Sequence, residues 1–292
     1  MKFAYYPGCS AKSTCSELSV STQRVAAKLG IELMEFRSAS CTGSREIRAV
    51  NRDRFLALNA RILAMADREN LPLLTVCNTC TLNFLDTQKV LKEEPETRDR
   101  VNAILADEGM KYAGTSRVTH FLWMLLEDVG AERLRRAIVR PLAGLRLAAF
   151  YGCHIIRPPA HFEFVESRNV KSIETLNEIL GCSSINYSGR TECCGFHTAA
   201  SNEKVAIKLT GRHIKSAKDG GAQAMVTPCP LCHTVLDSLQ REMERDLKTR
   251  LDMPILHLPQ LVGLALGMSP SDLQLERHMV PVNLQIGHSN RI

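Results

Sequence analysis

The sequence lacks the features that would place the chain in a membrane or direct it out of the cell. No run of apolar residues reaches the roughly 18 that a membrane-spanning helix needs. The opening residues, MKFAYYPGCS, contain neither the apolar core nor the small-residue cleavage site of a signal peptide. We therefore expect a cytoplasmic protein without a transmembrane segment.

The signatures of several cofactor-binding and nucleic-acid-binding proteins are also missing. No G-x-G-x-x-G motif follows a strand-like segment, so the chain has no signature of a flavin- or nicotinamide-binding domain. The closely spaced C-x-x-C-x-x-C run of bacterial ferredoxins is absent. The net charge is +6, and basic and acidic residues are interspersed rather than gathered into a stripe with aromatic residues. We therefore expect no binding of nucleic acid.

Cysteine, in contrast, is abundant, with 11 residues in a chain of 292. A reducing compartment disfavours structural disulfides, so these cysteines are better explained as metal ligands or catalytic thiols. They recur in two matching sets. The pairs CNTC and CPLC begin at Cys77 and Cys229, and the segments SCTG and ECCG begin at Ser40 and Glu192, both 152 residues apart. A run ending in GC precedes each set (FAYYPGC and LAAFYGC). The pattern indicates an internal duplication.

The duplication predicts the fold. Short apolar runs that end at glycine or before C-x-x-C read as strands, and the stretches 45–70 and 201–221 have the period and length of helices. This alternation favours an α/β fold of two duplicated halves with mostly parallel sheets, related by a pseudo-twofold axis. We place the halves at residues 1–142 and 143–292, with the linker within 137–144. The cysteines would then converge at the carboxyl edge of each sheet, where open α/β sheets bind ligands.

The number of cysteines differs between the sets. The first set is Cys9, Cys41, Cys77 and Cys80, and the second set is Cys153, Cys193, Cys194, Cys229 and Cys232. Four thiolates can hold either zinc or an iron–sulfur cluster. A fifth thiolate suggests a cluster with a bridging cysteine or a separate iron site, and Gly195 lets the chain pass close to it. Haem attachment at CPLCH is disfavoured, because the matching CNTCT has threonine in place of histidine.

Several other residues have less specific patterns. Cys15 and Cys182 have no partner in the other half and are interpreted as packing residues. His154, His197 and His233 flank the cysteine positions, and we expect them to donate hydrogen bonds near the site or to lie on the surface. His154 or His197 could also transfer a proton. The tail from Ser269 is interpreted as a partner-binding or loosely packed extension.

A single cysteine, a long gap, CCG, a further gap and CxxC together resemble the cysteine-rich CCG domain. Two copies with the opening YYPGCS resemble the B subunit of heterodisulfide reductase, and most of all the heterodisulfide reductase-like complexes of bacterial sulfur oxidisers. The resemblance implies that all nine cysteines of the two sets are cluster ligands. It implies a non-cubane [4Fe-4S] cluster in the second half. Thr42 replaces the second cysteine of the doublet in the first half, which implies a cubane or altered [4Fe-4S] cluster there, with zinc less favoured.

The resemblance also implies an activity. The leading hypothesis is the catalytic subunit of an oxidoreductase acting on thiol, disulfide or sulfane-sulfur groups, a lipoyl group among them, with chemistry at Cys193 and Cys194. Its partners would be the A-like, flavin-containing protein and the C-like, iron–sulfur protein of such a complex. The alternative is an electron-transfer or membrane-docking CCG subunit of a succinate-, glycolate- or lactate-type dehydrogenase. A structural zinc scaffold is the third hypothesis, which the cysteine doublet disfavours.

Overall fold

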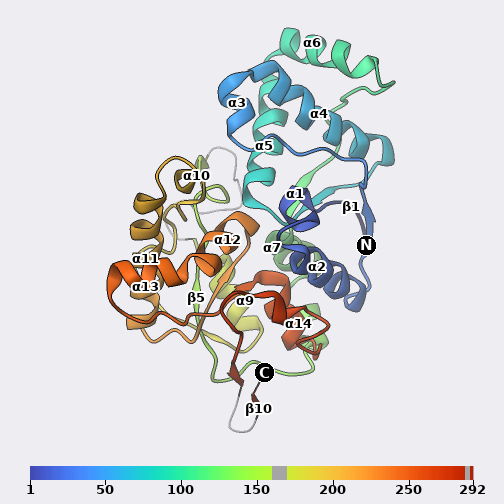
Figure 1. Ribbon diagram of the computed structural model, residues 1–292. Coiled ribbons are helices and arrows are strands. Elements are labelled where there is room, and N and C mark those ends of the chain that lie inside the picture. The colour runs from blue at the N-terminus through green and yellow to red at the C-terminus, as the bar shows by residue number, and fades with distance from the viewer. Residues whose placement is uncertain (160–169, 287–289, 292) are drawn as a thin grey trace.

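The computed structural model describes residues 1–159, 170–286 and 290–291. Two four-stranded parallel sheets form its framework, one in each half of the chain (Figure 1). The strand orders are β2-β1-β3-β4 and β6-β5-β7-β8, so the second sheet repeats the topology of the first. The register repeats as well, because Ala4 pairs with Leu73 in one sheet and Ala148 pairs with Met225 in the other. The predicted α/β fold of duplicated halves with mostly parallel strands is confirmed.

The elements of the first half are β1 (Lys2–Tyr6), α1 (Gly8–Lys12), α2 (Ser16–Lys28), β2 (Glu32–Glu35), α3 (Glu46–Val50), α4 (Arg52–Glu69), β3 (Leu73–Thr75), α5 (Asn78–Glu93), α6 (Pro95–Ala106), β4 (Val118–His120), α7 (Phe121–Trp123), the π-helix η1 (Met124–Val129) and α8 (Ala131–Ala137). Those of the second half are β5 (Arg146–Ala149), α9 (Ser172–Ile179), β6 (Ser183–Ser184), α10 (Phe196–Ala199), α11 (Glu203–Asp219), β7 (Ala224–Thr227), α12 (Pro230–Ser238), α13 (Gln240–Leu247), β8 (Ile255–His257), α14 (Leu258–Ala265), the 3-10 helix η3 (Leu275–Arg277) and an antiparallel pair, β9 (Gln285–Ile286) and β10 (Asn290–Arg291).

The strands β3 and β7 are buried along their whole length and are apolar up to a final threonine, as strands of a parallel sheet covered on both faces should be. The helix expected over 201–221 is α11, and Gly221, with φ of +87°, follows its end. The stretch 45–70 forms two helices rather than one. Asn51 between them has an extended backbone, and its side chain accepts a hydrogen bond from the Arg54 N–H at 2.8 Å. Asn51 is therefore the N-cap of α4, and α4 begins as a separate helix after it.

The two halves share their hydrophobic cores. One cluster of buried side chains joins Leu18 of α2 to Leu258 and Leu261 of α14, and the two helices pack against each other. The segment between α8 and β5 is part of this packing, because Leu142 is fully buried and its N–H donates to the Leu180 carbonyl at 2.9 Å. The domain boundary at 142/143 falls in this segment and stays a prediction.

The tail after α14 is packed against the rest of the protein up to residue 284. Leu273, Leu275 and Leu284 are buried in the shared core, and the His278 side chain is buried among polar groups. The interpretation of a loosely packed extension is therefore wrong where these leucines and His278 are buried. A partner-binding role of the tail stays a prediction. Residues 287–289 and 292 lie outside the described part of the chain.

Asp67 in α4 connects this helix to the segment before β4. Its carboxylate accepts the backbone N–H groups of Ala113, Gly114, Thr115 and Ser116 at 2.8–3.0 Å. Burial raises the pKa of Asp67, but these hydrogen bonds outweigh it and lower the pKa below its ordinary value.

We expect Asp67→Asn to lower the free energy of unfolding by roughly 1.5–3 kcal/mol at pH 7. Because the folded pKa is depressed, this stabilisation is present above the unfolded value of about 3.9 and is lost as the pH falls through the folded pKa. Urea unfolding of both proteins between pH 7 and pH 3 measures the difference. Asp246→Asn, at an exposed position of α13, is the control. A difference between wild type and Asp67→Asn that does not shrink on acidification would contradict this assignment.

Candidate functional site

The nine cysteines of the two sets lie at the carboxyl ends of the strands, as predicted. Cys9 and Cys153 follow the first strand of each sheet, β1 and β5. Cys77 and Cys229 follow β3 and β7 and are the N-cap residues of α5 and α12. The segments with Cys41 and with Cys193–Cys194 follow β2 and β6. Asn78 and Thr79 at the start of α5 line the same cavity as Leu231 and Cys232 of α12, and Figure 1 shows these two helices near each other where the halves meet.

The first set of cysteines lines one cavity of about 260 Å³. Cys9, Cys41, Cys77 and Cys80 all contribute to its wall. The thiol of Cys41 donates a hydrogen bond to the Cys9 sulfur at 3.6 Å. This hydrogen bond lowers the pKa of Cys9 to about 6 and raises the pKa of Cys41. Four sulfur atoms therefore face one space, although they are contributed by three loops that are far apart in the sequence.

The second set is packed more tightly. All five of its cysteines line a cavity of only about 20 Å³, and their thiols lie close enough to shift one another's pKa. The hydrogen bond from Cys153 is the largest of the effects that lower the pKa of Cys193, to about 2. Neighbouring sulfurs thus share protons, and a bound cluster would replace those protons.

The doublet segments of the two halves have the same backbone geometry. Gly43 and Gly195 both have φ of +84°, a left-handed conformation that favours glycine. In each case the glycine N–H donates to the sulfur of the cysteine two residues earlier, Cys41 or Cys193, at 3.4 Å. Backbone N–H groups directed at sulfur stabilise thiolates in cluster sites. The alignment of SCTG with ECCG is therefore correct in three dimensions.

Thr42 occupies the position that Cys194 has in the second half. Its buried hydroxyl lies 3.6 Å from the sulfur of Cys80, to which it donates, and it accepts a hydrogen bond from the Asn83 side chain at 3.2 Å. Cys194 is correspondingly hydrogen-bonded to Cys232. The Thr42 oxygen is thus already engaged in two hydrogen bonds. That it does not ligate a metal stays a prediction.

The two cysteine sets touch each other. The thiols of Cys77 and Cys229 lie close enough across the interface between the halves to raise the pKa of Cys77 and to lower that of Cys229. The Asn78 side chain spans the same interface and donates to the Tyr151 carbonyl at 2.8 Å. The two cavities also have residues in common, among them Thr79 from the first half and Phe196 from the second.

The histidines at the second cavity have different surroundings. The guanidinium of Arg45 donates to Nε2 of His154 at 2.7 Å, so the opposite nitrogen, Nδ1, donates to the Thr79 hydroxyl at 2.9 Å. Burial lowers the pKa of His154. Both ring nitrogens of His154 are therefore engaged, and its ring is fixed in the neutral form.

His197 has one ring nitrogen left over. Its Nδ1 donates to the Glu46 carboxylate at 2.9 Å, while Nε2 has no hydrogen-bond partner among the described residues. The His197 ring also lines the second cavity. Sequence reasoning did not identify Arg45 and Glu46, because both belong to the first half while their partners belong to the second. The only signal for them is their position directly after SCTG.

The remaining candidates lie away from the cavities. His233 is buried, and its Nε2 contacts the Ile255 carbonyl at 3.0 Å, so it does not line either cavity wall. Cys182 is buried in the hydrophobic core, as a packing residue should be. Cys15 is also buried, but it lies beside Glu17, His233 and His257.

The donor atoms fit a thiolate-bound metal cluster. Sulfur is the ligand that iron–sulfur clusters use, and four or five sulfurs converge at each site. The N-terminus of α5 begins at Cys77, and that of α12 begins at Cys229, so the helix dipoles favour negative charge there. No helix among the described residues is both long and apolar enough to cross a bilayer.

The CCG family of cysteine-rich domains matches this chain twice, at residues 3–85 and 147–237. The chain therefore belongs to the CCG cysteine-rich domain family, and its tandem arrangement is that of proteins like the B subunit of heterodisulfide reductase. It is a subunit of the iron–sulfur redox type.

Two relatives show the range of complexes in which such chains occur. The chain is 39% identical, over 96% of its length and 97% of the relative's, to the membrane anchor subunit of 8-methylmenaquinol:fumarate reductase from Wolinella succinogenes. It is 30% identical, over 96% of its length and 94% of the relative's, to the B subunit of a ferredoxin/F420H2-dependent CoB-CoM heterodisulfide reductase from Methanosarcina acetivorans. The fold also matches a hypothetical protein from Helicobacter pylori, with a TM-score of 0.78 and 17% identity, over 96% of this chain and 52% of that one.

The equivalence of Thr42 and Cys194 provides a matched pair of variants. We expect Cys194→Ala to change the EPR spectrum of the second site and to leave the fold intact, because four thiolates remain there. Thr42→Ala should leave iron and acid-labile sulfide content unchanged, because the threonine oxygen is not a ligand. EPR of the anaerobically purified proteins, with iron and sulfide analysis, measures both. A Cys194→Ala spectrum identical to wild type would remove Cys194 from the ligand set.

Proposed function

We propose that this chain is the iron–sulfur subunit of a multi-subunit oxidoreductase and that electrons pass through it between its two cysteine sets. The observation that carries this proposal is the proximity of the Cys77 and Cys229 thiols across the interface, close enough for each to shift the pKa of the other. If both sulfurs are cluster ligands, the two clusters are neighbours with no intervening residue. The residues that would hold them are the four cysteines of the first set and the five of the second.

The different numbers of cysteines at the two sites support different roles for them in electron transfer. The first site, with four cysteines, suits a cluster whose irons are fully ligated and which only relays electrons. The second site, with five, suits a non-cubane [4Fe-4S] cluster, and a redox cluster there would supply single-electron chemistry. Because the chain carries no flavin signature, its electrons come from or go to a flavin-containing partner and an iron–sulfur partner.

The first candidate for the whole complex is a fumarate- or succinate-type oxidoreductase. The 39% identity to a fumarate reductase membrane anchor subunit over nearly the full length supports it. The chain would then dock such an enzyme at the membrane surface and exchange electrons with a quinone, without spanning the bilayer. The loss of the second doublet cysteine at Thr42 agrees with this role, because a relay site does not need an open iron.

The second candidate, favoured by the intact doublet Cys193–Cys194, is a cytoplasmic subunit that acts on sulfur groups. A disulfide or lipoyl-type group would take up two electrons and two protons and leave as two thiols, with the electrons supplied by the flavin partner. His197 would deliver a proton through Nε2, since Glu46 holds its other nitrogen. His154 would orient the site instead, because Arg45 blocks its lone pair.

The relay predicts magnetic interaction between the two sites. In the fully reduced protein we expect EPR signals broadened or split by spin coupling, because a ligand of one site contacts a ligand of the other. Cys77→Ser should weaken this coupling, whereas Cys182→Ser, a buried cysteine outside both sets, should preserve it. Two magnetically isolated signals in the wild-type protein would contradict the relay.

A reoxidation assay separates the two candidates. The protein is reduced with a viologen dye and mixed anaerobically with either a menaquinone analogue or a small disulfide. For the first candidate we expect rapid reoxidation by the quinone and none by the disulfide. Repeated turnover of the disulfide, slowed by His197→Gln, would replace the first candidate with the second.

A further inference from the structure

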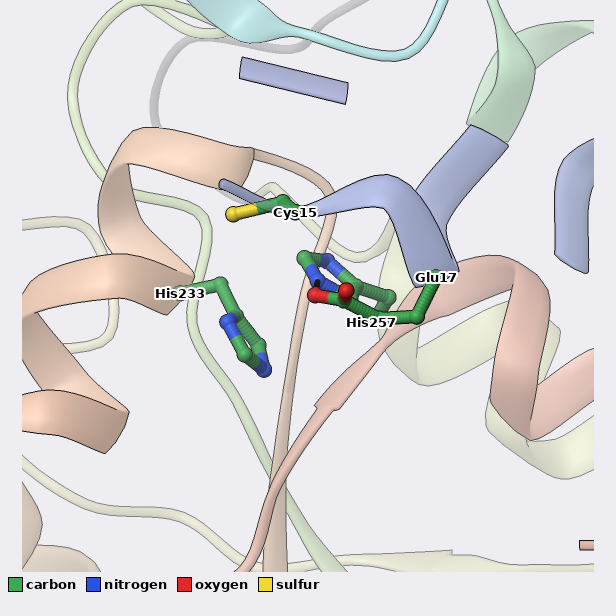
Figure 2. A group of neighbouring side chains, drawn as sticks. All are labelled: Cys15, Glu17, His233 and His257. Atoms are coloured by element: carbon green, nitrogen blue, oxygen red, sulfur yellow. Dashed lines mark hydrogen bonds and ion pairs between the residues drawn. The ribbon is translucent and has the colours of Figure 1, made fainter. Parts of the chain in front are cut away.

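A cluster of buried side chains of the types that can bind metals lies apart from the two cysteine sets. Its members are all buried and come from the start of α2, from α12, from the end of β8 and from the tail; they are Cys15, Glu17, His233, Asp237, His257 and His278. Figure 2 shows four of them, Cys15, Glu17, His233 and His257, lying close together. His233 belongs to two overlapping groups, one with Cys15, Glu17 and His257 and one with Asp237 and His278.

The hydrogen bonds around Gln260 determine which nitrogen of His278 carries a proton. The Gln260 amide oxygen accepts the backbone N–H of His257 at 2.9 Å, and its amide nitrogen donates to the Leu273 carbonyl at 3.1 Å. The same oxygen lies 3.0 Å from Nε2 of His278. Nε2 of His278 is therefore an N–H, and Nδ1 has a lone pair.

Two lone pairs then face a single nitrogen of His233. Nε2 of His233 lies 3.2 Å from Nδ1 of His278 and 3.0 Å from the Ile255 carbonyl oxygen. Two acceptors that converge on one buried ring nitrogen are satisfied either by an N–H of His233 that they share or by a metal ion bound at that point.

The geometry of His233, Asp237 and His278 fits a bound metal ion. The rings of His233 and His278 are inclined at 80°, with centroids 4.8 Å apart. Two nitrogens bound tetrahedrally to zinc at about 2.0–2.1 Å would be about 3.3 Å apart, close to the 3.2 Å observed here. Asp237 lies one turn after His233 on α12, with a carboxylate oxygen within 4.8 Å of both nitrogens. The N–H groups of Met279 and Val280 hold that carboxylate at 2.7 and 3.1 Å.

The overlapping group of Cys15, Glu17, His233 and His257 is a poorer fit to a metal ion. The rings of His233 and His257 are stacked, with centroids 3.7 Å apart and an inclination of 20°. The lone pairs of an imidazole lie in the ring plane, so two stacked rings do not converge on one ion. His257 Nε2 is instead paired with the Glu17 carboxylate at 3.1 Å, which also holds Arg277 at 3.2 Å (Figure 2 shows the first pair). These residues surround His233 without completing a ligand set.

We propose that His233, Asp237 and His278 bind one divalent transition-metal ion such as Zn²⁺, next to the Ile255 carbonyl oxygen. Two imidazoles and a carboxylate are a ligand set that zinc takes readily. The N–H of His278 to Gln260 is the outer hydrogen bond that fixes the tautomer of a metal-bound histidine. The ion joins the tail to α12, whose first turn carries Cys232 of the second cysteine set.

Anomalous diffraction on the full-length protein tests the site directly. Crystals of anaerobically purified protein are soaked with zinc chloride, and data are collected just above and just below the zinc absorption edge, which distinguishes zinc from cluster iron. We expect a zinc peak at bonding distance from His233 Nε2 and His278 Nδ1. No peak would show that a proton holds the pair together and would overturn the proposal. A peak beside Cys15 and Glu17 would overturn the ligand assignment.

Zinc content and thermal stability provide an independent test. Asp237→Asn and His278→Gln should each bind one zinc fewer per chain than wild type, by mass spectrometry of metals, and should lose the rise in Tm that zinc gives wild type. Glu17→Gln should keep that zinc, as should His120→Gln, a buried histidine at the end of β4 whose ring contacts the Pro228 carbonyl and the Leu122 N–H. Any zinc in the cysteine sites is common to all variants. Equal zinc content in wild type and Asp237→Asn would refute the site.

Discussion

The candidate site depends on the contact between the carboxyl ends of two parallel sheets. Each sheet places its cysteines at that edge, and the edges meet so closely that the thiols of Cys77 and Cys229 shift each other's pKa. Each of these residues is also the N-cap of a helix that begins at the same point. Helix dipoles and backbone N–H groups at this edge stabilise negative sulfur, which a thiolate-rich site requires.

This contact also explains why the halves are not independent units. Arg45 and Glu46 belong to the first half, yet they orient His154 and His197 at the second cysteine set. Phe196 belongs to the second half, yet it lines the cavity of the first set. The shared cores and the packing of α2 on α14 fix the relative position of the halves that these contacts need.

Duplication provided one scaffold twice, and individual side chains made the two sites different. The turns at Gly43 and Gly195 have the same φ and the same N–H to sulfur contact. Thr42 and Cys194 occupy the same place in these turns, but only the second can act as a soft ligand. The cavities differ as well, at about 260 and about 20 Å³. Relatives named for fumarate reductase and for heterodisulfide reductase show that one scaffold occurs in different complexes.

The sequence alone determined the features that depend on local pattern and on regular spacing. Apolar runs such as LPLLTV and AQAMVT identified β3 and β7, and the repeated offset identified equivalent cysteines. Parallel strands have one carboxyl edge, so the convergence of the cysteines followed directly. The capping signal of Asn51 was also in the sequence, but it was hidden by the continuous helical period on both sides.

Only the tertiary structure decided which residues that are distant in the sequence contact one another. The pairing of Arg45 with His154, the burial of the tail and the gathering of His233, Asp237 and His278 all depend on how the halves dock. Sequence periodicity reports which face of an element is apolar, but not which side chains of another element meet it. Those contacts are set by the packing of complete layers, because each side chain's partner is fixed only when the whole core is filled.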